Sequence, residues 1–125
     1  MQKKNLIVFD IDDTLTKSEY QHQEAYIKTM IDFGITEINK DWKSYPNVTD
    51  SHILKLNYEA NFKKEFDLSL IPDFEEKMTQ KMLALTKTEE INGARNIVDF
   101  FMKQTNYAIC FATGSFLQPA LLKLA

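Results

Sequence analysis

The chain has 125 residues, a formal net charge of −3 and a single cysteine, Cys110. This length suits one domain with room for a subdomain, and 44% hydrophobic residues are enough for a core. The small negative charge gives no indication of binding to nucleic acid or to an anionic membrane. A lone cysteine excludes an internal disulfide, and no stretch resembles a signal peptide or a membrane span. We therefore expect a cytoplasmic protein.

The first element is an apolar run, residues 6–9, which ends abruptly in Asp10, Asp12, Asp13 and Thr14. Because the run is β-branched and continuous, it predicts a central strand of a parallel sheet that is covered on both faces. Sheets of this kind bind ligands beyond the carboxyl ends of their strands. Three neighbouring acids stay ionised only beside a cation or hydrogen-bond donors, and their oxygen atoms suit Mg²⁺.

Three helices are predicted next. The first covers residues 19–33, with Ser18 and Gln21 as a capping box. The second begins near residues 49–50, and the third follows Pro72, which suits a first helical turn. Large apolar side chains recur every three or four residues in all three, as in helices that pack against one another.

Several single residues in this region have a structural interpretation that we favour over a functional one. His22 and His52 are isolated, without a second ligand at metal-binding spacing, and we expect them at the surface or in caps. Trp42 is expected to pack rather than to touch substrate. Lys55 and Asn57 face away from the apolar stripe of the second helix, and the sequence does not decide whether solvent or substrate meets them.

The end of the chain predicts one more helix opened by Ala94, then a second buried strand, residues 107–112. This strand closes in Thr113 and Gly114, and a final helix is expected from Ser115 onward. A glycine at the start of a helix lets the backbone N–H groups approach an anion closely.

The stretch from Asp10 to Thr14 resembles the D-x-D-x-T motif of the haloacid dehalogenase (HAD) superfamily. The resemblance implies that Asp10 is the nucleophile that takes a phosphoryl group and that Asp12 is the general acid and base. The Asp10 carboxylate and the backbone carbonyl of Asp12 would help hold Mg²⁺, and Thr14 would brace the loop. The alternative is an acidic turn that only caps a helix, which we consider the weaker interpretation in this strand context.

The strand that ends in Thr113 is similar to the second HAD motif, which implies that Thr113 and Gly114 bind the phosphoryl oxygens. The implied fold is α/β, a Rossmann-like HAD core with parallel strands formed by residues 1–15 and 89–125. Residues 16–88 would be an inserted α-helical cap. Thr49 and Asp50 are either substrate-facing residues of that cap or an ordinary N-cap, which we favour slightly.

An acid at Asp12 resembles the phosphatases and phosphomutases of the superfamily, such as phosphoglycolate phosphatase and β-phosphoglucomutase. The expected activity is Mg²⁺-dependent hydrolysis of a small phosphorylated metabolite through an aspartyl-phosphate. The lysine of the third motif and the acidic pair of the fourth do not follow within these 125 residues, so we expect the N-terminal part of a longer phosphatase, with an incomplete core. Because these groups are absent, this part alone is expected to bind Mg²⁺ weakly and to show little or no turnover. The alternative is a catalytically inactive binding module, and the oligomeric state is not indicated.

Overall fold

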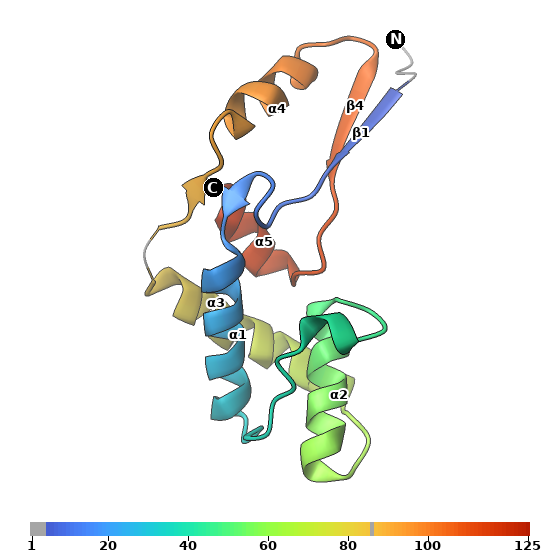
Figure 1. Cartoon of the computed structure of the whole chain (residues 1–125), viewed down its shortest axis with the longest axis vertical. Helices are drawn as coiled ribbons and strands as arrows, with labels where there is room; N and C mark the ends of the chain where they lie inside the picture. The colour runs from blue at the N-terminus through green and yellow to red at the C-terminus, as the bar shows by residue number, and fades with distance from the viewer. Residues whose placement is uncertain (1–4, 86) are drawn as a thin grey trace.

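The computed structural model describes residues 5–85 and 87–125 (Figure 1). Helices and strands alternate along the chain, with most of the helices between the first and last strands. In order they are β1 (Asn5–Phe9), β2 (Thr16–Lys17), α1 (Glu19–Asp32), the 3₁₀ helix η1 (Trp42–Ser44), α2 (Asp50–Phe62), the 3₁₀ helix η2 (Leu68–Leu70), α3 (Ile71–Leu83), β3 (Glu89–Glu90), α4 (Ala94–Met102), β4 (Tyr107–Phe111) and α5 (Leu117–Leu124).

The two long strands β1 and β4 are neighbours and run parallel, in register from Asn5 opposite Tyr107 to Phe9 opposite Phe111. The structure confirms the two predicted strands and their parallel arrangement. The expectation of a central strand covered on both faces is wrong, because β1 has a single neighbour in the described sheet, and Leu6 is 61% exposed and Val8 is 52% exposed. In Figure 1 the strand pair extends away from helices α1, α2 and α3, with α4 beside β4, so these helices do not cover β1.

The main hydrophobic core of the described residues lies among helices α1, α2 and α3, between β1 and β4 in the sequence. Tyr26 and Met30 of α1, Leu54 of α2, and Phe74 and Met78 of α3 are all at most 2% exposed. Tyr26 and Met30, like Phe74 and Met78, are four residues apart, which puts each pair on one face of its helix, as the sequence predicted. This part of the chain therefore carries most of the apolar burial that stabilises the fold.

Two further contacts connect these helices to the strands. Helix α5 packs against α3, although α5 follows β4 in the chain. The short strands β2 and β3 pair antiparallel, with Thr16 opposite Glu90, and so hold together the two chain segments that lead into and out of the helices. This small pair was not predicted, since two residues carry no strand pattern. The division into a core and a cap remains a prediction.

Some local expectations are wrong. The Ser18 side chain makes no capping hydrogen bond to α1, so the predicted capping box is absent. Asn57 is 4% exposed, and its amide donates to the hydroxyl of Tyr45 at 2.7 Å, so it faces the core rather than solvent or substrate. Lys55 is exposed. No helix built from the described residues combines the length and apolarity needed to span a membrane.

Candidate active site

The carboxyl ends of β1 and β4 lie side by side. The backbone N–H of Ala112 donates to the carbonyl oxygen of Phe9 at 2.9 Å, one residue beyond the last strand pair. Asp10 follows β1 directly, and Thr113 comes two residues after β4 ends at Phe111. The parallel register therefore brings the two motif-bearing segments to one edge of the sheet, where α/β folds bind ligands.

The loop after β1 is held by its own hydrogen bonds. The hydroxyl of Thr14 donates to Asp10 Oδ2 at 3.0 Å, and the N–H of Leu15 donates to the carbonyl of Ile11 at 2.9 Å. Asp13 has a φ of 57°, a left-handed conformation that aspartate adopts more readily than most residues. Ile11, only 1% exposed, anchors this turn, while Asp10 faces outward. Thr14 thus contacts Asp10, as a bracing role requires.

The carboxylate of Asp12, unlike the solvent-facing Asp10, makes a partly buried contact. Lys123 Nζ lies 2.8 Å from Asp12 Oδ1 and 3.0 Å from Oδ2, and the Ser18 hydroxyl donates to Oδ1 at 2.5 Å. Partial burial alone would raise the pKa of Asp12, but the hydrogen bonds from Lys123 and Ser18 outweigh it and hold the pKa below its usual value. Asp12 is therefore an ionised carboxylate in this arrangement.

Lys123 also connects Asp12 to a second pair. Its side chain is fully buried, and Nζ lies 2.8 Å from His22 Nδ1, while His22 Nε2 lies 2.8 Å from Asp50 Oδ1. Because an ammonium group only donates, His22 Nδ1 accepts and the imidazole proton sits on Nε2, facing Asp50. The expectation that His22 is a surface residue is wrong. Its two partners come from α2 and α5, which no local sequence pattern places beside it.

The segment after β4 packs closely against the start of α2. The carbonyl of Gly114 accepts from the N–H of Asp50 at 2.8 Å, and a Cβ at Gly114 would collide with the carbonyl oxygen of Val48. This glycine is thus needed for close packing, apart from any role toward phosphate. Thr113 is exposed, and its hydroxyl accepts from the N–H of Ser115 at 3.1 Å, as in a turn.

The two predicted cap residues have structural partners. Thr49 is the N-cap of α2, with its hydroxyl accepting from His52 N–H at 3.4 Å. The carboxylate of Asp50 is buried and accepts from His22 and from the N–H of Phe116 at 3.0 Å. The backbone carbonyl of Asp50 accepts from the Tyr26 hydroxyl. A direct role of either residue toward substrate remains a prediction.

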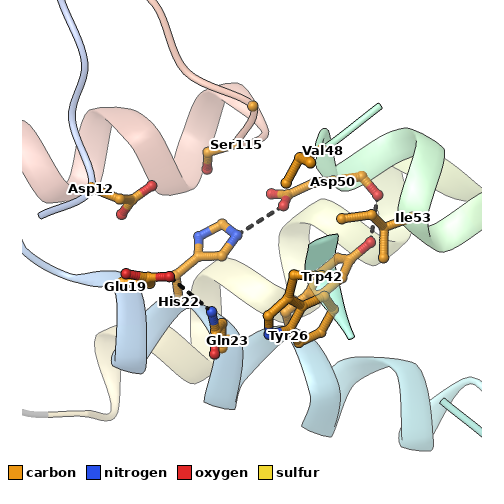
Figure 2. A pocket seen from close by; sticks show the side chains of 11 residues that line it. Asp12, Glu19, His22, Gln23, Tyr26, Trp42, Val48, Asp50, Ile53 and Ser115 are labelled. Atoms are coloured by element: carbon orange, nitrogen blue, oxygen red, sulfur yellow. Dashed lines mark hydrogen bonds and ion pairs between the residues drawn. The ribbon is translucent and has the colours of Figure 1, made fainter. Parts of the chain in front are cut away.

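A cavity of about 250 Å³ lies between the Asp12 loop, the turn after β4, and the helices (Figure 2). Figure 2 shows Asp12 and Ser115 on one side, His22 in the middle, and Trp42, Val48 and Ile53 on the side toward α2. Glu19 and Gln23 come from the first turns of α1. Trp42 packs against Tyr45 and the helical core, as predicted, yet it also lines this cavity.

The donor chemistry at this edge of the sheet is compatible with Mg²⁺. Asp10 presents a carboxylate whose one hydrogen bond within residues 5–85 and 87–125 comes from Thr14. In the same ranges, no group of three or more His, Cys, Asp or Glu side chains could hold a metal ion. Magnesium ions commonly bind through one or two carboxylates and complete their shell with water and substrate phosphate. A site built on Asp10 fits that mode, with few ligands from the protein.

Replacing Lys123 by methionine is expected to weaken the fall of the free energy of unfolding as the pH is lowered. Because the pKa of folded Asp12 lies below the unfolded value of 3.8, its ionisation stabilises the native state above that pH. This stability is lost as the pH falls through the folded pKa. Lys123→Met removes the main stabilising partner of the ionised form, so the folded pKa rises toward the unfolded one. Urea unfolding from pH 7 down to pH about 2 measures the change. An unaltered fall with pH would contradict the assignment of Lys123 as that partner.

Comparisons with known proteins identify a fold. No protein-family model and no curated protein sequence matches this chain. Among solved structures, a hydrolase from Pseudomonas syringae aligns with a TM-score of 0.62 at 19% identity, over 98% of this chain and 53% of the hydrolase. CbbY from Rhodobacter sphaeroides, solved in complex with phosphate, aligns with a TM-score of 0.64 at 18% identity, over 96% of this chain and 55% of CbbY.

The chain thus spans about half the length of these two structures. Identities below 20% establish similarity of fold and leave activity open. The comparison confirms the predicted fold class: the chain shares with both solved structures an α/β fold, a Rossmann-like core with parallel strands.

Proposed function

We propose that this chain belongs to a Mg²⁺-dependent phosphatase that hydrolyses a small phosphorylated metabolite through an aspartyl-phosphate on Asp10. The observation that carries the proposal is the position of Asp10. Its exposed carboxylate stands at the carboxyl end of β1, next to the end of β4, and Thr14 holds one of its oxygens. The fold is shared with a hydrolase and with a protein solved in complex with phosphate, and this also supports the proposal of a phosphatase.

In the proposed reaction an Asp10 oxygen attacks phosphorus while the bond from phosphorus to the leaving oxygen breaks. Water then attacks the phosphorus of the acyl phosphate and regenerates the carboxylate. Asp12 is the proposed proton carrier, which protonates the leaving oxygen first and takes a proton from water second. Its ionised state beside Lys123 suits the second of these tasks. For the first, Asp12 must gain a proton.

Thr113 and the backbone N–H of Gly114 are proposed to bind the phosphoryl oxygens. Both residues are exposed, and both follow the strand that lies beside β1. Asp10 and the backbone carbonyl of Asp12 would hold Mg²⁺. The ion, when bound, supplies positive charge that neutralises the phosphoryl oxygens.

A non-catalytic binding module is the second candidate function. The observation that favours it is the exposed apolar side of the strand pair, with Leu6 at 61% and Val8 at 52% exposure. A polar solvated face is more usual for a two-stranded edge. A phosphatase and a binding module are separated by whether the chain turns over a phosphate ester.

Removal of divalent metal is expected to abolish hydrolysis of an aryl phosphate, and added Mg²⁺ is expected to restore it. Without the ion, the Asp10 carboxylate and the phosphate dianion repel each other. The measurement, made on the complete protein that contains this chain, is release of the aryl alcohol at neutral pH, with EDTA and then with excess Mg²⁺. Turnover that persists in EDTA would contradict the metal requirement, and no turnover under either condition would favour the binding module.

A further inference from the structure

The cavity beside Asp12 has walls that carry negative charge and lack an accessible cation. Its acidic and imidazole side chains are Asp12, Glu19, His22 and Asp50, and within the described part of the chain no lysine or arginine lines it. The nearby ammonium group of Lys123 is fully buried and is already shared between Asp12 and His22. It therefore does not reach a molecule in the cavity.

His22 is not free to contact a ligand through its ring nitrogens. Nδ1 lies 2.8 Å from Lys123 Nζ and Nε2 lies 2.8 Å from Asp50 Oδ1, so both nitrogens are already used within the protein. The cavity thus contains three carboxylates against one buried, fully used cation.

The acidic side chains around Glu19 are crowded. The pKa of Glu19 is raised first by a hydrogen bond with Asp13, then by burial, and further by repulsion from the charges of Asp13 and Asp12. Glu19 itself is exposed, and its Oε1 accepts from Gln23 at 3.2 Å. A second anionic group on a ligand would meet these carboxylates without a counter-charge.

The remaining wall is apolar and aromatic. Val48 and Ile53 line it together with Trp42, whose ring stacks on Tyr45 with a centroid distance of 6.2 Å. An indole face attracts C–H surfaces and ammonium groups and does not attract anions. The volume of about 250 Å³ also limits the ligand to a small molecule.

We infer that the substrate of this site is a small phosphomonoester whose alcohol part is neutral or carries an ammonium group, and that a carboxylate or second phosphate on that part is rejected. This rests on the proposed function, because it assigns the phosphate to the Asp10 edge and the alcohol part to the cavity. It argues against phosphoglycolate and bisphosphates as substrates.

Three phosphate esters of equal length provide the test: aminoethyl phosphate, hydroxyethyl phosphate and phosphoglycolate. They differ in the charge of the terminal group and little in size. We expect the kcat/KM measured with phosphoglycolate to be at least about tenfold below that measured with hydroxyethyl phosphate, because like charges brought together in a site repel strongly. The amine is expected to equal or exceed the alcohol.

Glu19→Gln provides a variant that removes one of the carboxylates. Relative to hydroxyethyl phosphate, it is expected to raise kcat/KM with phosphoglycolate by about threefold or more and to lower kcat/KM with the amine. The matched control is Glu24→Gln, on the same helix, where the carboxylate pairs with Lys28 at 2.9 Å and does not line the cavity. This control should leave the ratios among the three esters unchanged.

The outcomes separate the inference from the function on which it rests. Turnover of phosphoglycolate that equals or exceeds that of the alcohol would overturn the inference and leave the phosphatase proposal intact. Ratios that move equally in Glu19→Gln and Glu24→Gln would also overturn it. No turnover of any of the three esters, nor of an aryl phosphate, by the complete protein that contains this chain would overturn the phosphatase proposal, and the substrate assignment with it.

Discussion

Replacement of Asp10 by asparagine is expected to lower the turnover of an aryl phosphate by at least about a thousandfold, because an amide oxygen is a poor nucleophile toward phosphorus. The asparagine side chain keeps the size of Asp10, and its oxygen can still accept from the Thr14 hydroxyl, which donates at 3.0 Å. The loop is therefore expected to keep its structure. Initial rates with saturating Mg²⁺ give the measurement.

A second readout identifies the intermediate. The wild-type chain, quenched with acid during turnover, should carry a phosphate that is released by hydroxylamine, as an acyl phosphate is, and Asp10→Asn should carry none. Asp73→Asn is the control, since Asp73 lies at the start of α3 and pairs with exposed Lys77 at 3.3 Å. Full activity in Asp10→Asn would rule out Asp10 as the nucleophile.

Truncation of Phe74 to alanine is expected to produce the largest loss of stability, about 3–5 kcal/mol in the free energy of unfolding. Phe74 has no exposed surface, and its ring lies 5.6 Å from that of Tyr26, 5.2 Å from Phe33 and 5.9 Å from Phe116. Alanine would leave a cavity among these rings. Because small domains have a total stability of about 5–15 kcal/mol, such a loss brings the chain close to unfolding.

Urea unfolding followed by far-UV circular dichroism gives the measurement for this truncation. The control is Phe100→Ala, which removes the same number of atoms from a side chain that is 58% exposed and should cost less than about 1 kcal/mol. Equal losses in the two variants would show that the cluster of helices α1, α2 and α3 is not the main source of stability.

Features that depend on neighbouring residues could be predicted from the sequence. The strands and the acids that follow β1 were found because an apolar run and its polar end are adjacent in the chain. The helices were found from the spacing of residues such as Leu54 and Met78, which lie on buried faces. Pro72 lies at the first turn of α3, as expected.

Features that depend on distant residues were missed. Asp12 and Lys123 are 111 positions apart, and His22 and Asp50 are 28 apart, so each appeared as an isolated charge or ring. Burial of Lys123 is also contrary to the usual preference of lysine for the surface, and only its two partners make it tolerable. Leu6 is exposed because no helix of the α1, α2 and α3 cluster covers β1. The residues of a strand do not reveal which other elements pack on it.

The pairing of β1 with β4 has a consequence for the order of folding. Asn5 and Asn106, which meet at the open end of this ladder, are 101 positions apart in the chain. Bringing such distant segments together costs loop-closure entropy before any contact is gained, and this slows the formation of non-local pairs. Helices α1 and α3 form from local contacts and, once packed, shorten the effective distance between the two strands. The ladder that presents Asp10 and Thr113 is therefore expected to form late, after helices α1 and α3 have packed.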